Sequence, residues 1–110
     1  MQISEMVTMS RQLIALFQKV EPRPWGVEAM LTELAGEVGT LADSVMIKEG
    51  YRRLRDGDTL NLEDDVADVL FMLIRIAEHY QINLEATYTQ MVETTQAKLE
   101  KRLREVYEGD

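Results

Sequence analysis

The sequence predicts an all-α protein, and three observations support that prediction. Four segments place apolar residues three and four positions apart, which is the spacing of one face of an α-helix. No segment shows a convincing alternation of apolar and polar residues, as a half-buried strand would. The 110 residues include only two prolines, both in one short stretch between helical segments. We therefore expect a compact helical bundle that forms a single domain over residues 1–110.

The first helix is expected near the start of the chain. It should end before Glu21-Pro22-Arg23-Pro24, because the residue before a proline is disfavoured in the helical conformation. The residues on its expected apolar face are Ile3, Met6, Val7, Ser10, Leu13, Ile14 and Phe17.

The second helix is expected from about Trp25 or Val27 to Lys48. Gly50 is a suitable terminator, because glycine readily adopts the left-handed conformation that ends many helices. A polar loop over residues 51–60 should follow. The expected apolar face of this helix contains Val27, Met30, Leu31, Leu34, Val38, Leu41 and Val45.

The third helix is expected from a cap at Asn61 to about Tyr80. Glu63 and Asp64 suit the positive N-terminal end of a helix. This segment is apolar on nearly every side, so it should be central in the fold. A chain of this length cannot easily cover a central helix all round. We therefore expect a homo-oligomer, either a homodimer or a homotetramer.

The fourth helix is expected to begin after a cap at Asn83 and to reach about Val106. The residues on its expected apolar face are Leu84, Tyr88, Met91, Val92, Thr95, Leu99 and Leu103.

Composition limits the classes of function. The formal net charge of −8 argues against a general affinity for nucleic-acid backbones or anionic membranes. No cysteine and only one histidine occur, which excludes disulfides, thiolate zinc sites and multi-histidine metal sites within one chain. No apolar run is long enough for a membrane span, and the N-terminus lacks a secretion signal. We expect a soluble cytoplasmic protein.

Acidic residues in apolar surroundings are the strongest functional signal. Asp68 interrupts the otherwise apolar run 66–74, and Asp65 lies one helical turn earlier on the same face. Glu33 and Glu37 share a face of the preceding helix. Carboxylates from two helices that face inward would repel each other unless a cation lies among them. Magnesium prefers a few carboxylates together with waters and phosphate oxygens, so a magnesium site is the favoured hypothesis.

Simpler interpretations remain open for these acids. Glu33 and Glu37 could face solvent, as most helical glutamates do. Asp65 could be an acid placed favourably in the first helical turn. Asp68 could form a buried ion pair with Arg75 or with an arginine of the fourth helix.

Two segments together resemble the MazG-like all-α nucleoside triphosphate pyrophosphohydrolases. The first is Gly36-Glu37-Val38-Gly39-Thr40-Leu41-Ala42-Asp43, and the second is Asp64-Asp65-Val66-Ala67-Asp68-Val69-Leu70. That family carries Glu-Glu-x-x-Glu and Glu-x-x-Asp motifs on successive helices with a loop between them. The stretch from Ile76 to Glu85 is also similar to the family's continuation, and the likeness covers roughly residues 25–102.

The resemblance implies a function and a set of site residues. The family cleaves nucleoside triphosphates between the α and β phosphates, giving a monophosphate and pyrophosphate, and magnesium is its usual cofactor. Glu37 matches the second position of the first motif, and Asp65 and Asp68 match the two acids of the second. Lys98 and Arg102 resemble a basic pair of the family. The expected function is therefore that of a Mg²⁺-dependent pyrophosphohydrolase.

The chain departs from the family motifs at three positions. Gly36 and Thr40 replace the first and last glutamates of the first motif, and Asp65 is one methylene shorter than the usual glutamate. Glu33 could compensate as an additional metal ligand. The alternative function is a catalytically degenerate helical oligomer that binds nucleotide or metal, or that serves as an assembly module.

Three further residues are candidates for contact with substrate. Lys98 and Arg102 could bind phosphate oxygens, or they could belong to a solvated basic helix end. Trp25 could stack on a nucleobase, or it could be an ordinary core or interface tryptophan.

Overall fold

The structure is a computed structural model that describes residues 1–108. Within this range it contains four α-helices and no strand: α1 (Ile3–Val20), α2 (Val27–Lys48), α3 (Leu62–His79) and α4 (Leu84–Glu108). The all-α prediction is confirmed, and each helix begins and ends close to where the sequence predicted. No helix in the described range is long and apolar enough to cross a membrane.

Local side-chain chemistry explains the helix ends. The Asn61 side chain accepts a hydrogen bond from the backbone N–H of Asp64 at 3.1 Å, and Asn83 accepts one from Ala86 at the same distance. Gly50 follows α2 with a φ of +84°, a conformation that side chains other than glycine rarely adopt. All three terminal signals predicted from the sequence are confirmed.

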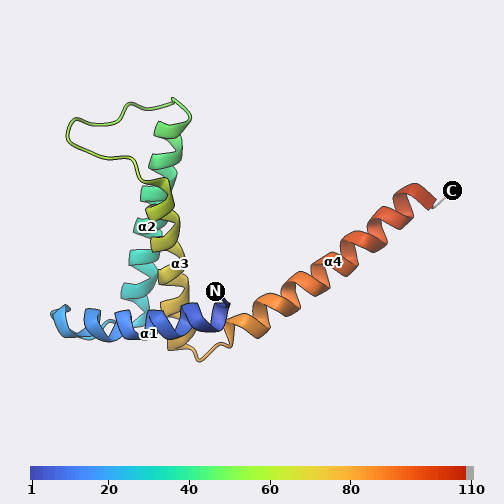
Figure 1. The fold of residues 1–110 in the computed structure, drawn as a ribbon, viewed down its shortest axis with the longest axis horizontal. Coiled ribbons are helices and arrows are strands. Elements are labelled where there is room, and N and C mark those ends of the chain that lie inside the picture. The colour runs from blue at the N-terminus through green and yellow to red at the C-terminus, as the bar shows by residue number, and fades with distance from the viewer. Residues whose placement is uncertain (109–110) are drawn as a thin grey trace.

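The helices pair but do not close into a compact bundle. The antiparallel helices α2 and α3 make the most extensive contact, α1 crosses one end of this pair, and α4 projects away from it (Figure 1). The radius of gyration is 18.7 Å, whereas a compact chain of this length would have about 13 Å. The expectation of a compact bundle is therefore wrong for the single chain, because α4 packs on little besides part of α1.

The chain covers only part of the expected apolar face of α2, because Met30 is buried and Val27, Leu34 and Leu41 are partly buried. The buried residues of α2 are Met30 and Ser44, whereas Leu31, Val38 and Val45 remain 59 %, 46 % and 44 % exposed. Helix α3 likewise leaves large apolar side chains exposed. These are Val66, Leu70 and Leu73. A single chain thus leaves much of its predicted apolar surface uncovered.

A buried ion pair fastens the end of α1 to α3. Both terminal nitrogens of Arg75 donate to the carboxylate oxygens of Glu21 at 2.9 Å, and the two side chains are only 3 % and 7 % exposed. The guanidinium also lies over the ring of Trp25, 4.7 Å from its centroid. The Arg75 Nε atom is buried without a hydrogen-bond partner. This cluster connects α1, the turn after it and the second half of α3.

Two more exposed contacts join α1 to α3. Arg11 forms an ion pair with Glu78, with a shortest distance of 2.6 Å, and the Arg11 side chain is mostly in solvent. The rings of Phe17 and Phe71 lie 5.7 Å apart. Because the buried ion pair has less access to water, its loss should cost more than the loss of the Arg11 pair.

Replacing Glu21 tests the importance of the buried pair. Glu21→Ala leaves the Arg75 charge buried without a partner, so the free energy of unfolding should fall by about 3 kcal/mol in urea denaturation followed by circular dichroism. The matched control is Glu78→Ala, which removes the more exposed pair and should lower the free energy of unfolding much less. Equal losses in the two variants would contradict this account.

Candidate functional site

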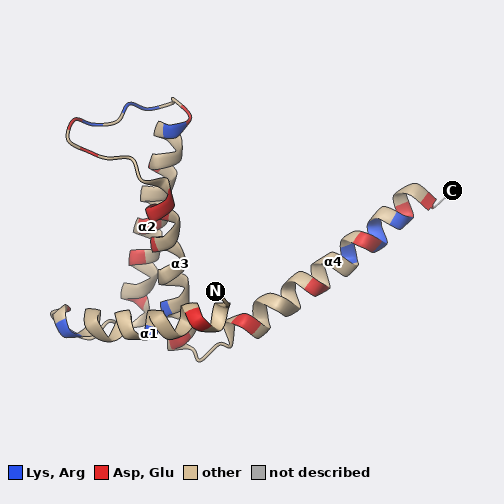
Figure 2. Ribbon diagram, in the orientation of Figure 1, with Lys and Arg blue, Asp and Glu red and all other residues tan. Residues whose placement is uncertain are grey.

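The pairing of α2 with α3 brings together the acids that the sequence singled out. Glu37 lies in the middle of α2, and Asp65 and Asp68 lie in the first half of α3. Figure 2 shows acidic segments side by side on the two helices. The pKa of Glu37 is raised, first by burial, then by a side-chain hydrogen bond with Glu33, and further by the negative charges of Asp68 and Asp65. The carboxylates are therefore close enough to repel each other.

Asp68 lacks a compensating cation. Burial raises the pKa of this half-buried carboxyl, and the charges of Asp64 and Asp65 raise it further. Among residues 1–108 no ion pair includes Asp68. The alternative of an Asp68–Arg75 pair is wrong, because Arg75 binds Glu21 instead. Nor does an arginine of α4 pair with Asp68 in the described range.

Asp65 has a partner that the sequence did not reveal. The hydroxyl of Ser44, near the end of α2, donates a hydrogen bond across to Oδ2 of Asp65. Ser44 lies two helical turns beyond Glu37, and this spacing places both residues on one face of α2. Helical periodicity could have placed Ser44 on the same face as Glu37. It could not have identified Asp65 as the hydrogen-bond partner of Ser44.

Thr40 does not take the place of the missing acid. Its hydroxyl donates to the backbone carbonyl of Gly36 at 3.2 Å and is therefore engaged within its own helix. Glu33, one turn before Glu37, is exposed yet interacts with the Glu37 carboxyl. Glu33 is thus an additional acid of α2 that interacts directly with the cluster through Glu37.

The donor chemistry fits magnesium, although the ligand geometry is not preformed. Carboxylate oxygens are the ligands that Mg²⁺ prefers, and the mutual repulsion of these acids would be relieved by a divalent cation. Yet no group of three acidic or histidine side chains within residues 1–108 is already arranged to hold an ion. A divalent-cation site between α2 and α3 would therefore need further ligands or other rotamers of these acids.

The expected substrate-binding residues lie apart from the acidic cluster within one chain. Lys98 and Arg102 belong to the part of α4 that extends away from the α2–α3 pair (Figures 1 and 2). Trp25 has one ring face covered by the Arg75 guanidinium. In the loop after α2, Arg52 binds Asp43 at 2.5 Å. The single chain therefore supplies the acids but does not bring Lys98 and Arg102 to them.

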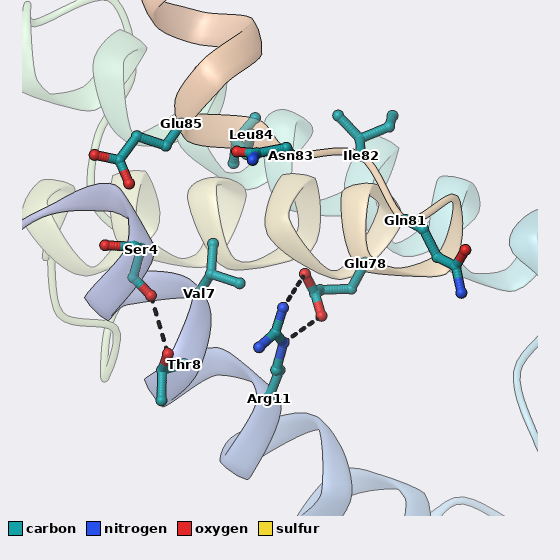
Figure 3. A pocket seen from close by; sticks show the side chains of 10 residues that line it. All are labelled: Ser4, Val7, Thr8, Arg11, Glu78, Gln81, Ile82, Asn83, Leu84 and Glu85. Atoms are coloured by element: carbon teal, nitrogen blue, oxygen red, sulfur yellow. Dashed lines mark hydrogen bonds and ion pairs between the residues drawn. The ribbon is translucent and has the colours of Figure 1, made fainter.

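A cavity at the other end of the fold is separate from these acids. It lies where α1, the end of α3 and the start of α4 meet, and Figure 3 shows the Arg11–Glu78 ion pair on its wall. Arg11 and Glu78 neutralise each other there, in contrast to the uncompensated acids of the α2–α3 pair.

Helix-borne carboxylates without cation partners define this chain as an all-α protein with the donor set of a divalent-cation site. The comparison with protein families is more specific. The family model of the MazG nucleotide pyrophosphohydrolase domain matches residues 26–107, and the chain belongs to this family. The matched range includes α2, α3 and nearly all of α4. Comparison with curated proteins found no significant match, and comparison with solved structures also found none.

The raised pKa of Asp68 predicts an unusual pH dependence of stability. Above the ordinary aspartate pKa of 3.8, the folded chain holds more protons at this site than the unfolded chain. The contribution of Asp68 to stability therefore falls as the pH rises through the window between the ordinary and the raised pKa. Asp68→Asn removes this penalty, so its melting temperature in EDTA should exceed that of the unmodified chain at neutral pH.

The gain should shrink as the pH is lowered through 3.8, because below this ordinary pKa Asp68 is largely protonated in both the folded and the unfolded chain. Glu63→Gln, which changes an exposed acid in the first turn of the same helix, is the control and should give no gain. A variant no more stable than the unmodified protein at neutral pH would show that Asp68 carries no electrostatic penalty.

Proposed function

We propose that the chain is a Mg²⁺-dependent nucleoside triphosphate pyrophosphohydrolase that converts an NTP or dNTP into a monophosphate and pyrophosphate. Membership of the MazG family supports the reaction class. The observation that carries the proposal is that Glu37 lies close to Asp65 and Asp68. Asp68 also has no ion-pair partner in the described range. Such an activity suits housekeeping of the cytoplasmic nucleotide pool.

The chemistry assigns a role to each acid. Glu37, Asp65 and Asp68 would hold the metal, and Glu33 would serve as an additional ligand from the preceding turn. Bound magnesium would neutralise the triphosphate and stabilise the charge that develops in the transition state. A carboxylate of the cluster can orient a water for attack on phosphorus, so no protein nucleophile is required.

A second copy of the chain is part of this proposal. Many large apolar side chains remain exposed on all four helices, and extensive exposed apolar surface is typical of association sites. Trp25 offers its remaining ring face as a candidate wall for a nucleobase. Lys98 and Arg102 are candidate phosphate ligands, and in a homodimer or homotetramer they could come from a partner chain.

The degenerate alternative has its own support. Thr40 replaces a metal-binding acid of the family motif and its hydroxyl is engaged with Gly36. The acids in the described range also form no ready group of three ligands. A scaffold that binds nucleotide with magnesium but does not turn it over would have both features.

An assay of the products distinguishes these functions. The purified chain, incubated with a panel of NTPs and dNTPs and with Mg²⁺, should release pyrophosphate and a monophosphate. Glu37→Gln and Asp68→Asn should each lower the rate by at least about 100-fold, because each removes a charged metal ligand. The measurement is pyrophosphate release with chromatography of the nucleotides.

Glu63→Gln is the matched control, because it alters an exposed acid in the first turn of α3 and should keep the full rate. Release of orthophosphate with a diphosphate would mean cleavage of the other anhydride bond and a different class of enzyme. Magnesium-dependent nucleotide binding without turnover would favour the degenerate scaffold. Full activity in both site variants would refute the site assignment.

Association is tested by the mass in solution. Light scattering coupled to gel filtration should give two or four times the mass of one chain, because the exposed apolar faces need cover. Leu73→Glu places a charge on the exposed apolar surface of α3 and should shift the protein to monomers, whereas Glu63→Gln should not. A monomeric unmodified chain at micromolar concentration would contradict the proposed assembly.

A further inference from the structure

Ser44 uses its hydroxyl differently from four other hydrogen-bonded helical hydroxyls of the described chain. Thr8, Ser10, Thr32 and Thr40 each donate to the backbone carbonyl four residues earlier in the same helix. This is the ordinary arrangement for a hydroxyl in a helix interior. Ser44 instead donates across the helix pair to Oδ2 of Asp65. It is also only 8 % exposed, so the bond is shielded from competing water.

The hydrogen bond from Ser44 restrains the side chain of Asp65. The Asp65 side chain is one methylene shorter than that of glutamate. Asp65 also lies in the first turn of α3, and helices fray most easily at their ends. Ser44 occupies one oxygen of this carboxylate from the opposite helix. The structure gives no hydrogen bond to the other oxygen, Oδ1, within the described residues. One oxygen is thus held by the protein while the second stays available to a ligand.

We infer that Ser44 is a positioning residue, which orients the Asp65 carboxylate for a divalent cation held between α2 and α3. The inference rests on the proposed function, since it requires that the acidic cluster binds metal. Groups that hydrogen-bond a metal ligand and fix its orientation typically contribute about 10-fold to 100-fold in metal affinity. Helix α2 thus contributes a hydrogen-bond donor to the site through Ser44, whereas its Thr40 contributes no carboxylate.

The experiment measures metal binding without nucleotide, so that it does not depend on turnover. Mn²⁺ is titrated into the full chain in a calorimeter, and Mn²⁺ electron paramagnetic resonance counts the bound ion independently. Ser44→Ala should weaken the affinity by about 10-fold, because the Asp65 carboxylate loses its anchor. Ser44→Thr keeps a hydroxyl and should restore at least half of the lost binding free energy.

Ser10→Ala is the matched control. Ser10 is also buried, at 9 % exposure, but its hydroxyl donates to the Met6 carbonyl of its own helix at 2.7 Å. Its loss should leave Mn²⁺ affinity unchanged, and circular dichroism with thermal melts checks that all variants are folded. If Ser44→Ala does not fold, the Thr variant and Ser44→Cys, which keeps the volume but donates weakly, carry the comparison.

The outcomes separate the inference from the proposed function. Binding by the unmodified chain with equal affinity in Ser44→Ala would overturn the role of Ser44 and leave the metal site intact. A loss that is not rescued in Ser44→Thr would also overturn it, as would an equal loss in Ser10→Ala. Absence of Mn²⁺ binding to the unmodified chain would overturn the inference together with the metal-dependent function.

Discussion

The antiparallel contact between α2 and α3 decides where every acid of the candidate site lies. It places Glu37 of one helix near Asp65 and Asp68 of the other, and the pKa of Glu37 is raised first by burial and further by the charges of these aspartates. Such an arrangement opposes the very packing that creates it, because each charge is partly removed from water. The helix pair must therefore be stabilised by contacts elsewhere along its length, or by a cation, or by both.

Helix α3 contains two kinds of charge, and they are treated differently. Arg75 is almost fully buried and has a bidentate partner in Glu21 and a ring face in Trp25. Asp68, two turns earlier, is half-buried and has no ion-pair partner in the described range. Burial with a good partner is typical of a structural group, whereas burial without one is typical of a functional group. The contrast within one helix supports assigning structure to Arg75 and chemistry to Asp68.

The success of the sequence predictions follows the range of the forces involved. Asn61, Asn83 and Gly50 act within a few residues, so helix ends could be predicted from local chemistry. The proximity of Glu37 to the aspartates of α3 could be predicted because helical periodicity fixes which residues share a face. The ion-pair partner of Arg75 could not be predicted, because Glu21 lies at the start of a turn whose path depends on tertiary packing. Ser44 was missed for the same reason, since its partner belongs to another helix.

The direction in which α4 runs relative to the other helices could not be predicted from sequence periodicity. Its apolar residues recur at helical spacing, which predicts a helix with one face to cover but does not identify what covers it. In the single chain Tyr88, Leu99 and Leu103 stay about half exposed. The acidic cluster and the basic residues of α4 are likewise separated along the length of the molecule (Figure 2). Hydrophobic burial and charge neutralisation are thus both incomplete within one chain, and a single act of association could satisfy both. Assembly and the proposed chemistry are therefore physically linked, because the same contact between chains would cover apolar side chains and bring basic residues of α4 to the acidic cluster.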